Sequence, residues 1–96
     1  MKKRNIKNIS KKLFKFEVNS LKEFNTAILN WEVLGGLTSP LLTDFISKDT
    51  GLFKRRLYAN LYGGELDYHD SEQLWYDSSF EKINFTGFIE LCSNAL

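Results

Sequence analysis

A pair of glycines, Gly63–Gly64, interrupts a stretch in which apolar and polar residues alternate. A two-residue type I′ turn requires positive φ at both central positions, and glycine adopts positive φ without strain. Folding the chain at this pair places Leu61 opposite Leu66, and Ala59 opposite Tyr68, so the apolar side chains share one face. Because a one-residue slip would move every side chain to the other face, the pattern predicts a β-hairpin. The predicted solvent-facing side carries Arg56, Tyr58, Asn60, Tyr62, Glu65, Asp67 and His69.

The segment 21–34 has the local signals of a helix. Ser20 followed by Glu23 fits a capping box, in which each residue satisfies a free N–H near the start of the helix. Gly35 supplies the left-handed residue that often ends a helix. The apolar stripe at helical spacing comprises Leu21, Phe24, Ile28 and Trp31. We interpret Trp31 as a core residue because it lies on this stripe.

Two further elements are expected in the first half of the chain. Phe14, Phe16 and Val18 alternate with charged residues, which favours a strand from about residue 12. Helical spacing of apolar residues over 6–16 competes with this interpretation and would permit weak docking on an anionic membrane. A short helix is predicted over 40–49, with Ser39 as its cap and Pro40 at its first position.

The last quarter of the chain is ambiguous. Residues 74–76 fit a short strand, although Ser71 could instead cap a helical turn. Alternation of Ile83 and Phe85 favours a strand centred on 83–91, with a short terminal helix as the alternative. The predicted fold class is therefore α+β: an antiparallel sheet, formed as a meander with the Gly-Gly hairpin, packed by two helices from the N-terminal half.

Length and charge bound the domain organisation. The chain has 96 residues, 43% of them hydrophobic, which supports one domain with a modest core. No apolar run reaches the 18 or so residues that a membrane span needs. Residues 1–15 hold seven of the thirteen basic side chains and no acid, whereas residues 65–81 hold six of the twelve acids and no Lys or Arg. We predict a basic flexible arm over 1–11 and a single domain over 12–96.

One cysteine and one histidine restrict the chemistry of the chain. A lone Cys92 excludes an internal disulfide, and we interpret it as a small buried hydrophobe near a terminal element. Any Ser-His-Asp arrangement would have to use His69, and no G-x-S-x-G motif is present. Glu65, Asp67 and His69 could share one strand face as ligands of a hard cation, but the solvent-facing side of a hairpin gives the same pattern. We therefore predict no enzyme, no metal site and no cofactor.

The segment from Tyr58 to Glu81 interleaves tyrosine and tryptophan with carboxylates. Tyr and Trp are enriched at protein interfaces, and carboxylates among them suit a strongly basic partner. A solvated meander with aromatic cross-strand pairs would give the same composition. The predicted partner-binding residues are Tyr58, Tyr62, Glu65, Asp67, Asp70, Glu72, Trp75, Tyr76 and Asp77.

These features favour a small non-catalytic inhibitory binding protein that docks a basic, nucleic-acid-handling protein partner. An immunity protein that neutralises a nuclease toxin, or a phage-encoded inhibitor of a host nucleic-acid enzyme, would be of this type. The alternative is a nucleic-acid-binding accessory protein that uses the basic arm and the Lys54-Arg55-Arg56 triplet. Lysines interrupt every apolar run near the N-terminus, so we expect no secretory signal and a cytoplasmic location.

Overall fold

The computed structural model describes Ile9 and residues 12–39, 54–60, 64–69 and 71–96. Within these ranges the elements follow one another along the chain as β1 (Phe14–Val18), α1 (Leu21–Val33), β2 (Leu37–Thr38), β3 (Arg55–Ala59), β4 (Glu65–Tyr68), α3 (Glu72–Trp75), β5 (Glu81–Lys82) and α4 (Phe85–Ala95). None of the helices in the described ranges has the length and apolar character that crossing a bilayer would demand.

The strands form one five-stranded sheet in the order β2-β4-β3-β1-β5. The β1/β3 and β3/β4 pairs are antiparallel, but the two edge strands β2 and β5 run parallel to their neighbours β4 and β1. The domain is α+β as predicted, whereas the expectation of a purely antiparallel sheet is wrong.

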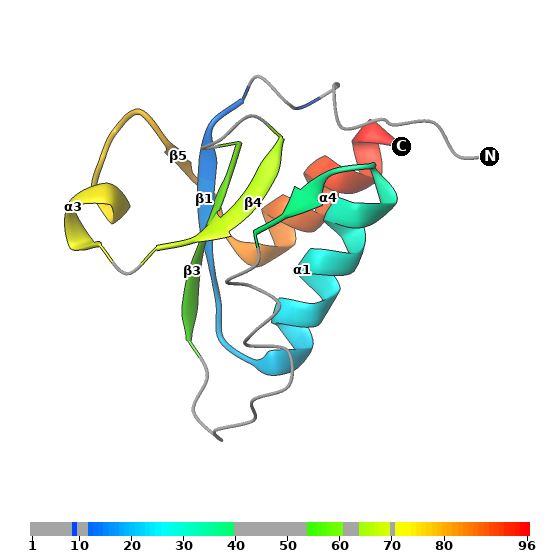
Figure 1. Ribbon diagram of the computed structural model, residues 1–96, viewed down its shortest axis with the longest axis horizontal. Coiled ribbons are helices and arrows are strands. Elements are labelled where there is room, and N and C mark those ends of the chain that lie inside the picture. The colour runs from blue at the N-terminus through cyan, green and yellow to red at the C-terminus, as the bar shows by residue number, and fades with distance from the viewer. Residues whose placement is uncertain (1–8, 10–11, 40–53, 61–63, 70) are drawn as a thin grey trace.

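Two helices, α1 and α4, lie side by side on one face of the sheet, called here the inner face (Figure 1). The short helix α3 lies on the opposite, outer face (Figure 1). Of the two packing helices predicted from the N-terminal half, α1 is confirmed, and α4 from the C-terminus packs beside it. The second predicted helix, over 40–49, lies outside the described residues.

The antiparallel pairing of β3 with β4 has a register different from the predicted one. Ala59 pairs with Leu66 and Leu57 with Tyr68, and the N–H of Asn60 donates to the carbonyl of Glu65 at 2.9 Å. Both registers keep the same residues on each face, because they differ by two residues. The turn itself is only partly described: Gly64 has φ +89°, and residues 61–63 lie outside the described ranges.

Asn60 follows the last residue of β3 and joins this end of the strand to the segment that precedes β1. It has a positive φ of 70°, a left-handed conformation that Asn tolerates better than most residues. Its side-chain Nδ2 donates to the carbonyls of Ile9 and Lys12 at 2.7 and 2.5 Å. Ile9 is itself buried in the core, although it falls within the segment predicted as a flexible arm. The other residues of 1–11 lie outside the described ranges, so the arm stays a prediction there.

Helix α1 begins and ends close to the residues that the sequence predicts. Ser20 Oγ accepts from the N–H of Glu23 at 3.0 Å, and Glu23 Oε1 accepts from the N–H of Asn19 at 2.9 Å. The carboxylate thus bonds one residue earlier than a standard capping box requires. Gly35 follows with φ +89° and donates its N–H to the carbonyl of Glu32 at 2.9 Å. The predicted helix is confirmed within one residue at its end.

The inner core is an aromatic layer between the sheet and the two helices. Phe16 stacks on Phe88 with ring centroids 4.1 Å apart, and Phe14 meets the edge of Trp31 at 6.3 Å. The indole Nε1 of Trp31 donates to the carbonyls of Leu37 at 3.0 Å and Gly64 at 3.2 Å. Trp31 is fully buried and ties β2 and β4 to α1, which confirms its interpretation as a core residue.

Two predicted strands are wrong, and in both places the alternative is present. Residues 72–75 form α3, with Ser71 Oγ accepting from the N–H of Leu74 at 3.2 Å. The predicted strand over 83–91 is instead α4, capped by Asn84, whose Oδ1 accepts from the N–H of Gly87 at 2.6 Å. The buried stripe of α4, formed by Phe88, Cys92 and Ala95, has helical spacing, whereas the alternation at Ile83 and Phe85 spans three residues.

Candidate functional site

The predicted partner-binding residues do not form one solvent-exposed surface. Tyr58 and Trp75 are buried on the outer face together with Phe80, and partly buried Leu74 packs against them; we call this group the outer cluster. The Tyr58 ring meets Trp75 and Phe80 edge-on, with centroids 6.3 and 5.6 Å apart. The outer face of β3 and β4 is therefore not the solvated surface that was predicted. Segment 71–82 folds back over it, which strand alternation cannot reveal.

Asp67 is also removed from solvent, with only 5% of its surface exposed. It pairs with Tyr58 across the strands, Oδ1 accepts from the N–H of Tyr68 at 2.8 Å, and Oδ2 lies 3.6 Å from His69 Nε2. The His69 ring packs edge-on against Tyr58, with ring centroids 5.7 Å apart. In the described parts of the chain, no group of three or more His, Cys, Asp or Glu side chains could hold a metal ion.

The exposed remainder of the predicted surface lies around α3. Tyr76 follows the helix with 70% of its surface exposed, and Glu72 and Asp77 on either side are exposed too. We call these three residues the α3 surface. Of the other predicted residues, Glu65 is half-buried on β4, and Tyr62 and Asp70 lie outside the described ranges. Asp77 Oδ1 accepts from the N–H of Ser79 at 2.8 Å, which lowers the pKa of this carboxyl.

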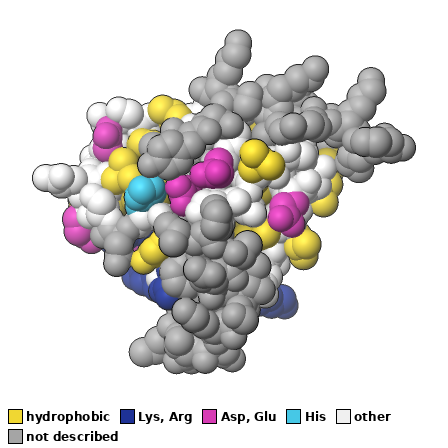
Figure 2. Space-filling view, viewed as in Figure 1, with side chains coloured by type: hydrophobic (Ala, Val, Ile, Leu, Met, Phe, Trp, Pro, Cys, Tyr) yellow, Lys and Arg dark blue, Asp and Glu magenta, His cyan; other side chains and the backbone are white. Residues whose placement is uncertain are grey.

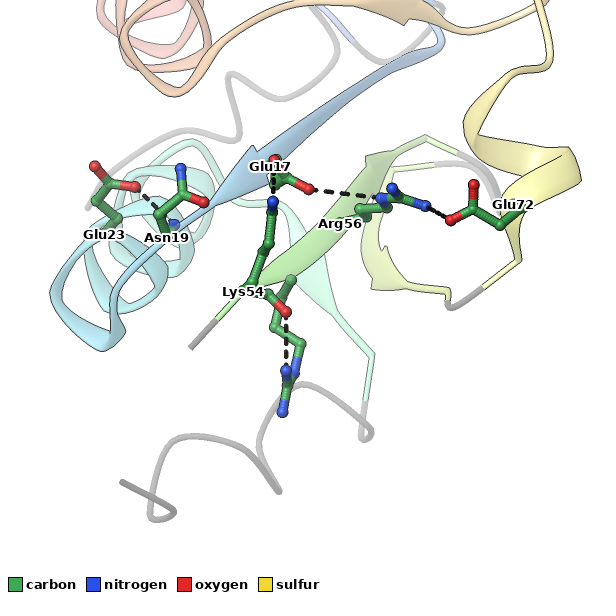
Figure 3. Close-up of polar contacts among 7 residues, drawn as sticks. Glu17, Asn19, Glu23, Lys54, Arg56 and Glu72 are labelled. Carbon is green, nitrogen blue, oxygen red and sulfur yellow. Dashed lines mark hydrogen bonds and ion pairs between the residues drawn. The ribbon is translucent and has the colours of Figure 1, made fainter. Parts of the chain in front are cut away.

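A chain of ion pairs crosses the outer face and was not predicted (Figure 3). Glu17 Oε1 lies 3.7 Å from Lys54 Nζ, and Glu17 Oε2 lies 3.5 Å from Arg56 Nε. Arg56 Nη1 then donates to Glu72 Oε1 at 2.6 Å, which joins the sheet to α3. Glu72 is therefore compensated by a cation from β3. The signal that could have found this network is the cross-strand register that pairs Glu17 with Arg56.

The basic triplet 54–56 does not form one patch. Lys54 and Arg56 take part in the ion-pair chain, whereas the Arg55 guanidinium lies 5.7 Å from the ring centroid of Tyr68. Successive residues of a strand face opposite sides of a sheet, so β3 separates its basic side chains. Acidic side chains are dispersed over the face seen in Figure 2, and the described Lys and Arg side chains gather at its lower margin.

Three cations surround the ring of Trp75. Arg56 and Lys82 each lie 4.8 Å from its centroid, and Lys15 lies 5.8 Å away. Lys15 is 3% exposed, and its Nζ donates to the backbone carbonyl of Asp77 at 2.6 Å. Burial lowers the pKa of Lys15, the positive charge of Lys82 lowers it further, and the carboxylate of Asp77 opposes both effects.

A groove of about 520 Å³ opens beside this cationic group, between the end of β1 and the start of α4. Its volume falls within the range of roughly 300–1,000 Å³ that is usual for ligand-binding pockets. Polar, charged and apolar groups all contribute to its walls. The lining residues are Glu17, Asn19, Glu23, Lys54, Arg56, Trp75, Lys82, Ile83, Asn84, Phe85 and Thr86.

Cys92 lies on the buried face of α4 as a free thiol. Burial raises the pKa of this thiol to about 12, so it is protonated at neutral pH and a poor nucleophile. Its interpretation as a small buried hydrophobe near a terminal element is confirmed.

Comparison of the chain with protein-family models, with curated proteins and with solved structures finds no match.

Proposed function

We propose that this chain is a small non-catalytic inhibitory binding protein that docks a basic protein partner through the α3 surface. The observation that carries the proposal is the exposure of Tyr76 between two exposed carboxylates, Glu72 and Asp77. Tyrosine supplies a large, rigid contact area with a polar tip, and it is enriched among the residues that dominate binding energy. A partner of this chemistry would be a nucleic-acid-handling protein, such as a nuclease toxin.

The position of α3 supports this role. Trp75 anchors the helix in the outer cluster, and the Arg56–Glu72 ion pair holds its first turn against the sheet. An aromatic side chain presented from an anchored turn loses less conformational freedom on binding than one on a mobile loop. Lys82 Nζ also lies 5.6 Å from the Tyr76 ring centroid.

Charge complementarity would act mainly on the rate of encounter. Exposed charge pairs contribute little affinity, but complementary fields steer association, and salt screens them over about 8–10 Å. Neutralisation of Glu72 by Arg56 leaves Asp77 as the α3-surface carboxylate without a described side-chain cation within 4.0 Å. The partner's basic residue is therefore expected beside Asp77, with an apolar contact on Tyr76.

The test begins with an affinity pull-down from the native host, followed by binding measurements on the purified partner. Tyr76→Ala should weaken binding about tenfold or more, as truncation of a central aromatic does. Asp77→Lys should slow association most at low salt. The matched control is Glu90→Lys, an exposed acid on α4. Equal affinity of all three variants and the wild type would contradict the α3 surface as the site.

Nucleic-acid binding is separated by a direct assay. Mixed-sequence duplex DNA titrated at physiological salt should show no binding by the wild type if the proposal holds. Binding that falls steeply with salt and is lost on Lys54→Gln would support the alternative function.

Charge reversal at Asp67 is not a useful test, because this buried carboxylate would be replaced by a buried cation and the fold would be destabilised.

A further inference from the structure

The groove beside Trp75 lies where the sheet has an open edge. Strand β5 pairs with only the first two residues of β1, Phe14 and Lys15, and the last bond between the segments runs from the N–H of Ile83 to the carbonyl of Lys15 at 2.9 Å. Strand β1 continues for three more residues to Val18. Beyond Ile83 the chain turns away into α4, and the groove occupies the space between.

The free edge presents backbone hydrogen-bonding groups at Glu17. The carbonyls of Leu13 and Lys15 both accept bonds from the β5 side. Because these groups alternate sides along a strand, the N–H and C=O of Glu17 face the same side, past the end of β5. Among the described residues, no backbone bond joins Glu17 to segment 83–86. The edge therefore offers one donor and one acceptor to an added strand.

The charge along the groove is uneven. Lys54 and Arg56 are paired with Glu17, and Arg56 also with Glu72. Lys82 has no carboxylate within 4.0 Å among the described side chains, and its positive charge lowers the pKa of the neighbouring Lys15. Glu23 also lines the groove, and its Oε1 accepts from the N–H of Asn19. Lys82 is the lining cation without a carboxylate partner among the described side chains, so an incoming carboxylate would neutralise it.

We propose that this groove binds an extended peptide segment of a protein partner, with its backbone paired to Glu17 and a carboxylate side chain beside Lys82. The backbone bonds would give affinity through strand addition, and the ion pair would give selectivity for an acidic segment. Trp75, Ile83 and Phe85 provide apolar wall for the neighbouring side chains of the peptide. The site borders the α3 surface, because Lys82 Nζ also lies 5.6 Å from the Tyr76 ring centroid, but it takes an acidic segment whereas the α3 surface would take a basic partner.

The probe is a capped five-residue peptide of sequence Thr-Val-Asp-Val-Thr, titrated into the ¹⁵N-labelled full chain and followed by NMR chemical shifts. The largest shifts are expected at Glu17, Lys82 and Thr86. The Asp-to-Asn peptide should bind about two- to fivefold more weakly, which is the range for a partly exposed ion pair. Lys82→Gln should cause a similar loss, with no further loss for the Asn peptide. Lys22→Gln, an exposed lysine of α1, is the control.

Strand addition has its own signature. Backbone N–H groups of an added strand point alternately toward and away from the sheet, so methylation of one alternate set of peptide nitrogens should abolish binding while methylation of the other set should not. Equal binding of both methylated peptides would overturn the proposal. So would equal binding of the Asp and Asn peptides, shifts confined to another part of the chain, or no binding at millimolar peptide. Shifts at Lys82 with inorganic phosphate alone would identify an unspecific anion site and would also overturn it.

Discussion

The two faces of the sheet are both covered, but they are covered in different ways. The inner face packs Phe14, Phe16 and Leu57 against two helices that each bury a full apolar stripe. The outer face packs Tyr58 against a single helical turn, and its cluster is ringed by Lys15, Arg56 and Lys82. We therefore expect the inner face to contribute most of the stability.

The outer face also contains buried polar groups whose burial lowers the stability of the fold. The hydroxyl of Tyr58 is buried without a hydrogen-bond partner among the described groups, and burial raises the pKa of this phenol. A buried polar group left unpaired costs about 1–3 kcal/mol. Lys15 is buried as well and bonds to a backbone carbonyl instead of a carboxylate. Compact packing on this face is thus achieved at some cost in stability.

The largest expected effect of a substitution lies on the inner face. Phe88 touches Phe14, Phe16 and Trp31, so Phe88→Ala removes the centre of the aromatic layer. Such truncations cost about 3–5 kcal/mol, a large part of the stability of a domain this size. Urea unfolding followed by circular dichroism should show a loss of that order. A loss smaller than that of the matching outer-face variant would reverse the comparison.

Trp75→Ala is the matching change on the outer face. It should cost about 2 kcal/mol, because the ring is bounded by solvated cations on one side and leaves a site that water can enter. The far-ultraviolet spectrum should keep the signal of α1 and α4, and the Tyr58 phenol should titrate at lower pH once it is exposed. An unchanged Tyr58 titration would show that α3 does not shield the outer face.

The two serine caps allow a finer comparison. Ser20→Ala should cost about 1 kcal/mol, because it removes the hydrogen bond to Glu23 at the start of the 13-residue α1. Ser71→Ala should cost less, because α3 is a single turn whose position is set by Trp75. Thermal melts of the two variants, each compared with Ser93→Ala as an exposed control, would measure the difference. Equal losses would mean that α3 depends on its cap as much as α1 does.

Burial of the Cys92 thiol should change the free energy of unfolding only at alkaline pH. Its pKa is raised to about 12 in the folded chain, so the unfolded chain releases the thiol proton first as pH rises. The stability linked to this thiol is complete below its ordinary pKa and is lost as pH rises toward 12. The free energy of unfolding should fall more steeply above pH 9 for wild type than for Cys92→Ala. A thiol reagent that reacts at once with the native chain at pH 8 would contradict the burial.

Local sequence signals determined the elements whose contacts are close in the chain. The Ser20–Glu23 cap, the apolar stripe and Gly35 predict α1 because a helix is stabilised by bonds between residues three or four apart. The alternation of Phe14, Phe16 and Val18 predicts β1 in the same way, since side chains of a strand repeat with period two. Burial of Cys92 and Trp31 followed from their type and position.

Only the tertiary structure decided what covers each face. Alternation shows that Tyr58 and Asp67 share a face but cannot show that segment 71–82 folds over it, because that contact joins residues far apart in sequence. The short run 83–91 fits both a strand and a helix, and the space beside α1 selected the helix. The acidic side chains were likewise predicted as one surface group. In the folded chain, however, Glu72 forms an ion pair with Arg56, and Asp67 is buried. Charges are placed by the packing of distant elements, and a one-dimensional pattern contains no distances between them.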